Sequence, residues 1–281
     1  MKKWLLLSCL CLLIACSANK KESSSPHQAE LPRPAQQDEK DDSEPTIRDI
    51  IINKYQGQSP TAWGEALHGI QRHIDTDQLV VALTFDACGG IHGSGYDADL
   101  INYLREMKIP ATLFINSRWI DANSDTFRTL SQSPLFEIEN HGSLHKPLSV
   151  NGRSEYGIQG TKNPGEVVDE VQLNHEKIEK LTGKAPKFFR SGTAFYDDVA
   201  VNIVADLKER PVGYSVLGDA GATFHTEQVK HALMSAKPGS IVILHMNQPS
   251  GDTAEGVKAA IPELIKRGLK FVKLSDLPLK E

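Results

Sequence analysis

The feature that most constrains the fold is an alternation of apolar and amphipathic segments between Val80 and Val272. The apolar segments are short and rich in β-branched residues, a pattern typical of buried strands. The amphipathic segments between them have helical periodicity, and the clearest, Gly165–Thr182, follows Pro164 and precedes Gly183, residues that often open and close a helix. Alternation of this kind predicts parallel strands with helices outside them.

The expected strands are Val80–Phe85, Ala111–Ile115, Leu135–Ile138, Lys187–Phe189, Val212–Val216, Ser240–Leu244 and Leu269–Val272. The expected helices are Asp97–Lys108, Asp125–Gln132, Gly165–Thr182, Val199–Lys208, Glu227–Ala236 and Thr253–Arg267. Such a pattern fits a doubly wound sheet or a barrel, and the polar residues favour the barrel. Asp86, His141, Arg190, Asp219 and His245 all fall at or just after the carboxyl ends of strands, where barrel enzymes gather their chemistry. We therefore expect an α/β fold, an irregular (β/α) barrel of about seven parallel strands.

The N-terminus has the composition of an export signal. Lys2 and Lys3 precede the apolar run Trp4–Ile14, which is too short to span a bilayer comfortably. The run closes on Leu-Ile-Ala-Cys16, which resembles a bacterial lipobox, so we expect residues 1–15 to be a lipoprotein signal peptide and Cys16 to carry lipid. The alternative is an ordinary secretory signal with an incidental cysteine. In a Gram-negative host, Ser17 after the cysteine resembles a signal for the outer membrane.

The rest of the chain divides into a tether and one domain. Residues 16–45 are rich in Ser, Pro, Lys and acids and predict a disordered tether, while 46–281 have the length of one α/β domain. With Cys9 and Cys11 removed and Cys16 acylated, Cys88 has no partner for a disulfide. The net charge of -5 gives no electrostatic reason to expect nucleic acid as a partner.

A carboxylate and two histidines give the first indication of chemistry. Asp86 ends an apolar strand-like run and precedes glycines, a pattern that delivers an acid into a cleft. His141 and His145 are four positions apart, so they can share one face of a helical turn and bind a divalent metal. Together these residues indicate metal-assisted hydrolysis. Ala87, beside Asp86, stands where a second acid would be most useful.

Five ordered motifs then identify a family resemblance. They are TFDACGG around Asp86, HGSLH from His141 to His145, Phe188–Gly192, Gly218-Asp219 and Ile243–His245. In this order they resemble the polysaccharide deacetylases, the NodB-homology domains of carbohydrate esterase family 4. The resemblance covers Val80 to Val272, and it implies the same kind of barrel.

The resemblance also implies a role for each site residue. His141 and His145 match the family's metal ligands, for a divalent metal that we expect to be zinc, with cobalt as the alternative. Asp86 matches the general base, and Arg190 the arginine that holds this base. His245 matches the general acid, and Asp219 the acid that orients it.

Two positions depart from the family pattern. The family usually has a second acid after the base, as the third metal ligand, and here that position is Ala87. Asp86 itself, Cys88 or a carboxylate from another loop would have to replace it. The third motif lacks the family's common prolines, although backbone amides near Thr193 and Ala194 can still form an oxyanion hole.

The resemblance predicts a metal-dependent hydrolase that removes N-acetyl groups from a cell-envelope polysaccharide or peptidoglycan. Its partners would be an acetylated glycan and the membrane that holds its lipid anchor. Two alternatives stay open: an O-deacetylase on the same fold, and a catalytically silent carbohydrate-binding lipoprotein. The sequence does not specify the glycan or the oligomeric state.

Overall fold

The structure is a computed structural model that describes residues 44–281. The predicted signal peptide, Cys16 and nearly all of the predicted tether lie outside the described residues. Residues 44–281 fold as one unit around their own hydrophobic core. Within this unit, no helix is both long enough and apolar enough to cross a membrane.

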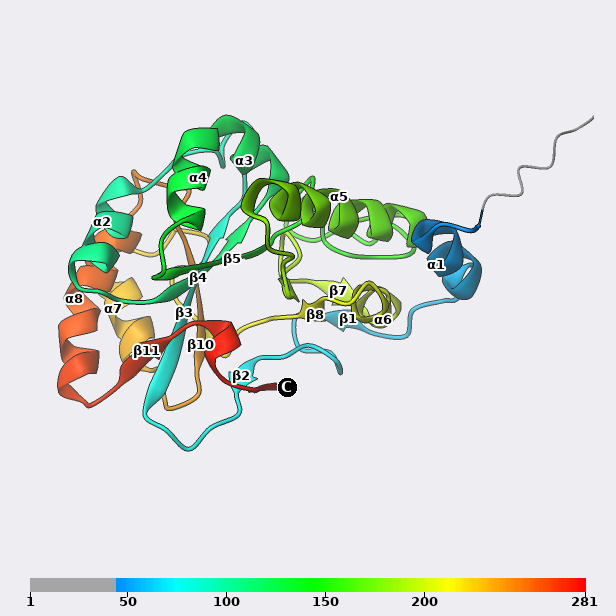
Figure 1. The fold of residues 1–281 in the computed structure, drawn as a ribbon. Coiled ribbons are helices and arrows are strands. Elements are labelled where there is room, and N and C mark those ends of the chain that lie inside the picture. Colours follow the sequence, from blue (N-terminus) through cyan, green and yellow to red (C-terminus); the bar gives the residue numbers. More distant parts are fainter. Residues whose placement is uncertain (1–43) are drawn as a thin grey trace, which may run out of the picture. The chain divides into compact units, whose positions relative to one another are not determined.

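Parallel strands form the centre of the fold (Figure 1). They are β3 (Val80–Ala87), β4 (Ala111–Ile115), β5 (Phe136–Asn140), β6 (Phe188–Phe189), β8 (Arg210–Pro211), β9 (Val216–Leu217), β10 (Ile241–His245) and β11 (Lys270–Val272). Seven of them are ordered β8-β6-β5-β4-β3-β10-β9, and β11 pairs with the first part of β3. The predicted irregular barrel of parallel strands is confirmed.

One predicted strand is wrong. Instead of a strand over Val212–Val216, the chain forms the two-residue strands β8 and β9, which lie at opposite ends of the sheet order. Residues 212–215 cross between them, with Gly213 N–H donating to Gln71 and Ser215 N–H to Ile241, both at 2.9 Å. Pro211 and Gly213 explain the break, because proline lacks a ladder donor and glycine disfavours an extended strand.

Helices surround the sheet (Figure 1). They are α1 (Ile47–Tyr55), α2 (Ala98–Glu106), α3 (Ser117–Ala122), α4 (Ser124–Ser131), α5 (Pro164–Thr182), α6 (Asp198–Asp206), α7 (Thr226–Met234) and α8 (Thr253–Lys266), with a 3-10 turn at Leu274–Asp276. All six predicted helices are present with small shifts at their ends. The short helix α3 was not predicted, and the Asn116 side chain caps it by accepting from Arg118 N–H.

Two small antiparallel pairs complete the fold. Strand β1 (Trp63–Gly64) pairs with β7 (Tyr196–Asp197), and β2 (His73–Ile74) pairs with β12 (Leu279–Lys280). The first pair brings the segment before the barrel next to the chain that follows β6. The N-terminal segment therefore lies near the carboxyl ends of the barrel strands rather than apart from them.

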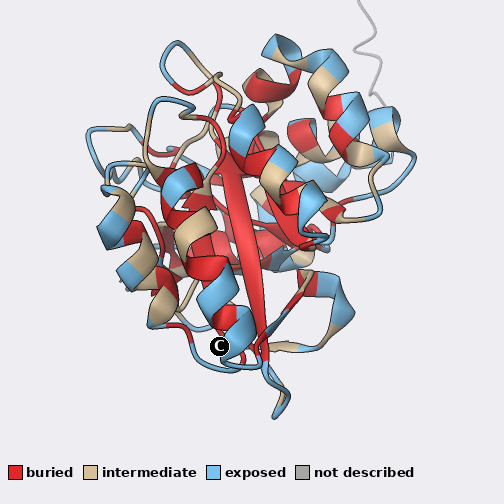
Figure 2. Cartoon of the chain, turned by 90° about the vertical axis from the view of Figure 1, so that its left-hand side faces the viewer, coloured by how far each residue is buried: buried red, intermediate tan, exposed pale blue. Residues whose placement is uncertain are grey.

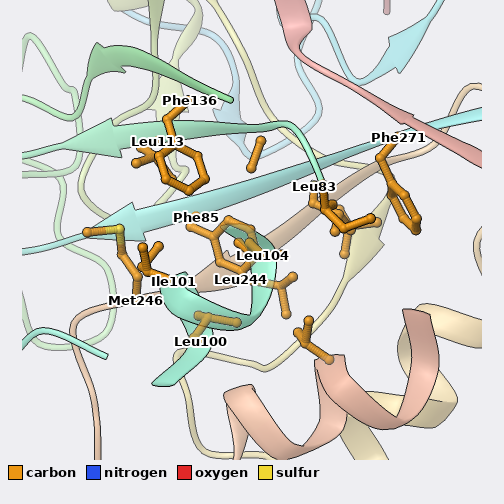
Figure 3. Close-up of a cluster of buried hydrophobic side chains, with 14 of the residues drawn as sticks. Leu83, Phe85, Leu100, Ile101, Leu104, Leu113, Phe136, Leu244, Met246 and Phe271 are labelled. Carbon is orange, nitrogen blue, oxygen red and sulfur yellow. The ribbon is translucent and has the colours of Figure 1, made fainter. Parts of the chain in front are cut away.

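Strand β3 is the central strand, and all of its residues are buried (Figure 2). Leu83, Phe85 and Ala87 belong to a core cluster that includes residues of α2 and α8 (Figure 3). Full burial of a Leu or Phe side chain contributes about 1.5–3 kcal/mol, so this core stabilises the domain without a disulfide. On the opposite face of β3, Thr84 and Asp86 contact the interior side chain of Arg190.

Candidate active site

A cleft of about 650 Å³ opens at the carboxyl ends of the strands. Asp86, Cys88, His145 and His245 contribute to its lining, although they come from three different parts of the sequence. His141, Arg190 and Asp219 are buried close behind them. The structure therefore brings all the predicted catalytic and metal-binding residues together.

Asp86 is held by a buried arginine. The Arg190 guanidinium, which has no exposed surface, donates to Asp86 Oδ1 at 2.7 Å and to Thr84 Oγ1 at 2.9 Å. It also donates to the carbonyl of Gly213 at 2.9 Å and lies over the ring of Phe114. These contacts fix Asp86 with Oδ1 engaged, so Oδ2 is the oxygen left to act in the cleft.

His245 is held by a buried carboxylate, Asp219, as Asp86 is held by Arg190. Asp219 Oδ1 accepts from His245 Nδ1 at 2.8 Å, and Oδ2 accepts from the His245 backbone N–H at 2.7 Å and from Thr253 Oγ1 at 2.9 Å. Burial alone would lower the pKa of His245, but Asp219 raises it well above its usual value. Burial alone would raise the pKa of Asp219, but its bonds to His245 and Thr253 lower it. His245 is therefore kept in the protonated form, with Nε2–H left to donate. Thr253 was not predicted.

The two histidines do not share a helical turn, so that prediction is wrong. Residues 141–148 form a loop after β5, and His145 has a left-handed backbone with φ of 60°. The rings meet edge to face with their centroids 4.9 Å apart. His141 Nδ1 donates to the Arg190 carbonyl at 2.9 Å, which leaves His141 Nε2 as the nitrogen with a lone pair for a ligand.

The donor atoms near these rings fit a divalent metal. One ligating atom from each of Cys88, His141 and His145 lies within 4.8 Å of the other two. Burial, the largest effect, would raise the pKa of the Cys88 thiol, but the facing histidines together lower it well below its usual value. Among the described residues this is the group of His, Cys, Asp and Glu side chains with such spacing. A thiolate and two imidazoles are donors that zinc and similar metals accept.

Sequence reasoning missed the residues that shape the histidine loop. Glu170, buried on α5, accepts from the backbone N–H groups of Leu144 and Lys146 at 2.9–3.1 Å. A Cβ at Gly192 would lie 2.2 Å from the carbonyl carbon of His145, so only glycine fits there. The one sign of this role in the sequence is that Glu170 lies among the valines on the apolar face of α5.

The predicted oxyanion donors differ in their availability. Ala194 N–H donates to the Ser191 carbonyl at 3.0 Å and so is already engaged. Thr193 also lines the cleft, beside Gly192. Of the two, the Thr193 amide is therefore the better candidate to stabilise a developing oxyanion.

Aromatic side chains form one wall beside the cleft, and they too were missed. Tyr156, which lines the cleft and is 71% exposed, packs edge to face on Phe195 at 5.7 Å between centroids. Trp63 lies 5.7 Å from the same Phe195 ring, and the Arg153 guanidinium lies over Trp63. We refer to Trp63, Tyr156 and Phe195 as the aromatic wall. The loop at 149–163, between β5 and α5, supplies Tyr156.

Comparisons with known proteins agree with this fold. The peptidoglycan-N-acetylmuramic acid deacetylase PdaA of Bacillus subtilis is 24% identical over 211 residues, which are 72% of this chain and 73% of that protein. A family 4 acetyl xylan esterase from Clostridium thermocellum, solved in complex with a cobalt ion, is 26% identical, with a TM-score of 0.55 over 70% of this chain and 89% of that one. A CE4 family pseudoenzyme from Bacillus anthracis has the same fold at 22% identity, with a TM-score of 0.60 over 73% of this chain and 67% of that one.

The family model of polysaccharide deacetylase matches residues 73–212, which begin at β2 and end just after β8. This span holds Asp86, both histidines of the loop and Arg190, and the barrel continues beyond it to Asp219 and His245. Sequence match, barrel and relatives point to one family. The chain therefore belongs to the polysaccharide deacetylase family of hydrolases.

Proposed function

We propose that this protein is a metal-dependent hydrolase that removes N-acetyl groups from a cell-envelope polysaccharide or peptidoglycan. The observation that carries the proposal is a pair of opposed proton-transfer groups facing one cleft. Asp86 is held by Arg190, and His245 is held by Asp219. A binding protein has no need of a positioned base and a positioned acid at the same time.

Asp86 acts as the base in this proposal. Arg190 occupies its Oδ1 atom, so Oδ2 faces the cleft and takes a proton from the attacking water. Arg190 has a backbone role too, since its carbonyl accepts from His141 Nδ1 and so fixes that ring. One residue therefore aligns the base with a predicted metal ligand.

His245 acts as the acid. Its Nδ1 is engaged by Asp219, so the proton that it gives to the departing amine leaves from Nε2. The raised pKa of His245, caused by Asp219, keeps this proton in place near neutral pH. The two groups are thus placed to act as base and acid on one substrate, as general acid–base catalysis requires.

His141 and His145 would hold a divalent ion, which we expect to be zinc, with cobalt as the alternative. When bound, such an ion polarises an amide carbonyl and makes a nucleophile from water near neutral pH. The fit of the donor set supports this assignment, because His141 Nε2 faces Cys88 Sγ at 3.9 Å and His145 lines the same cleft. The cobalt found with the acetyl xylan esterase is a further support.

The aromatic wall supports a carbohydrate substrate. Tyr156 is the exposed ring of this wall, and it offers a flat apolar face on which the C–H face of a sugar ring can pack. The name of the Bacillus subtilis relative points to peptidoglycan as the polymer. The predicted export signal and the lipid on Cys16 would place the domain, on its tether, beside such polymers in the cell envelope.

The test is acetate release by residues 44–281 from N-acetylglucosamine oligomers and from peptidoglycan, with zinc supplied. We expect a chelator to abolish release, and His245→Gln to lower kcat by roughly 100-fold or more. The matched control is His231→Gln, which changes an exposed histidine of α7 and should leave the rate unchanged. An O-acetylated xylan in parallel distinguishes N- from O-deacetylation.

Ala87 favours a second candidate, a catalytically silent carbohydrate-binding protein, because alanine has no ligating atom. The likeness of the fold to the Bacillus anthracis pseudoenzyme is in line with it. The assay above decides between the two. Saturable glycan binding with no acetate from any acetylated glycan would reject the hydrolase and favour the silent protein.

A further inference from the structure

We propose that Cys88 supplies the third protein ligand of the metal, so that the site is a thiolate with two imidazoles. The family pattern uses an acid at the position of Ala87, one residue earlier. The inference rests on the proposed metal dependence, but it concerns which atom of this chain binds the ion. Three observations support it: the direction of the strand, the spacing of the donors and the engagement of the competing acid.

The direction of β3 turns Ala87 away from the site. Ala87 is fully buried in the core cluster on the helix side, together with Leu83 and Phe85. Side chains alternate along a strand, so Asp86 faces the interior and Cys88, two residues on, returns to the same side. The register of β3 with β4, which pairs Ala87 with Ile115, extends to this point.

The spacing of the donors fits one ion. In a tetrahedral zinc site a sulfur and a nitrogen ligand lie about 3.6 Å apart, given Zn–S and Zn–N bonds of about 2.3 and 2.0–2.1 Å. Cys88 Sγ is 3.9 Å from His141 Nε2, and the His145 donor lies within 4.8 Å of both. A closure of no more than about 1.5 Å would bring all three donors to ligand distance.

Asp86 is the nearest competitor, since its Oδ2 is 3.7 Å from His141 Nε2. It does not belong to the group of donors that lie within 4.8 Å of one another, and Arg190 holds its other oxygen at 2.7 Å. Within residues 44–281, no carboxylate completes the histidine pair as Cys88 does. Asp86 is therefore free to remain the base.

A sulfur ligand has a consequence for the choice of metal. Thiolates favour zinc and other soft or borderline ions over magnesium and manganese, which prefer oxygen ligands. We therefore expect zinc and cobalt to bind residues 44–281 at one ion per chain. Magnesium and manganese should not displace them at equal concentration.

The experiment is a titration of residues 44–281 with Co²⁺, followed by absorption spectroscopy and by equilibrium dialysis. We expect an intense thiolate-to-cobalt charge-transfer band in the near ultraviolet. Cys88→Ser should lose this band and weaken cobalt and zinc binding by roughly 100-fold. His92→Gln is the matched control, because His92 lines the same cleft outside the donor group and should leave band and affinity unchanged.

A second measurement uses the unchanged chain and does not depend on how the variant folds. Cys88 is the one cysteine in residues 44–281, so a thiol reagent reports on it alone. Zinc should protect it from the reagent, and a chelator should restore its reactivity. The proposal would be overturned by any of three results: cobalt that binds without a charge-transfer band, equal metal affinity in Cys88→Ser, or no bound metal. Metal bound through sulfur without acetate release would leave it standing and reject the proposed hydrolase.

Discussion

At the scale of single residues, three consecutive residues at the end of β3 and just after it have three different environments. Asp86 bonds to a buried guanidinium, Ala87 packs among apolar side chains, and Cys88 faces two histidines. A change of one position along a strand reverses the face that a side chain presents. The alanine of the first motif is therefore part of the core, and the loss of an acid there is matched by a thiol at the next position.

This placement makes a prediction about Ala87→Asp, the change that would restore the family pattern. The new carboxylate would be buried among apolar side chains without a partner, so we expect a loss of stability of about 3 kcal/mol or more. Chemical denaturation of both chains measures the loss. Ala82→Ser, at a buried position of the same strand, is the control for a small polar change. A variant of unchanged stability that binds cobalt more tightly would contradict both the prediction and the assignment of Cys88.

At the scale of elements, helix α5 positions the end of the barrel that carries the histidines. Glu170 binds the histidine loop, and Asn174 donates to the Ile115 carbonyl and to Asn140 Oδ1, both at 2.8 Å. The next residue, His175, bonds through Nδ1 to Glu209 Oε1 at 2.8 Å, just before β8. One helix face thus ties together β4, β5 and the chain that leads into β8.

The pair of His175 and Glu209 predicts a dependence of stability on pH. The bond to Glu209 raises the pKa of His175, and burial raises the pKa of Glu209. Both groups hold protons more tightly when the protein is folded, so stability falls as pH rises. The part contributed by His175 is fully present below pH of about 6.5 and is lost as pH rises through its raised folded-state pKa.

Denaturation of the wild type and of His175→Gln at a series of pH values measures this effect. The wild type should be more stable by about 1 kcal/mol at pH of about 6, and the difference should shrink towards pH of about 9. His231→Gln, which alters an exposed histidine of α7, should show no such trend. A difference that stays constant over this range would show that the pair has no such linkage.

At the scale of the whole molecule, the cleft is assembled from parts distant in sequence. Trp63 precedes the barrel, Tyr156 lies in the loop between β5 and α5, and Phe195 follows β6. The pairing of β1 with β7 holds the first of these beside the third. Substrate binding by the aromatic wall thus depends on a segment outside the barrel.

We predict that Tyr156→Ala weakens substrate binding more than catalysis. The stacking contact that is lost contributes about 1 kcal/mol of binding free energy. KM for an N-acetylglucosamine oligomer should therefore rise roughly 5-fold, with kcat nearly unchanged. Leu181→Ala, at an exposed position near the end of α5, is the control. Steady-state kinetics on oligomers of increasing length measures the effect, and a fall in kcat at constant KM would reject a binding role for the wall.

Much of this arrangement could be predicted from the sequence. Periodicity located six helices and most strands, and polar residues at strand ends located Asp86, Arg190, Asp219 and His245 on one edge. The backbone at His145 could not be predicted, because it depends on Glu170 and on a glycine 47 positions later, at 192. The place of Cys88 was left open for the same reason, since local pattern does not give distances to a loop 53 residues away.

Arg190 has a structural role besides its contact with the base, because it also binds the segment between β8 and β9. Its guanidinium donates to the carbonyls of Val212 and Gly213, the segment that crosses this gap, as well as to Asp86. The same cation therefore closes the barrel wall and aligns the base. A descendant that lost its chemistry would still be under selection to keep this arginine, because without it two buried carbonyls lose their donor. A retained Arg190 in a family member therefore indicates a requirement of the fold. A retained His245 is the better indicator of catalytic activity.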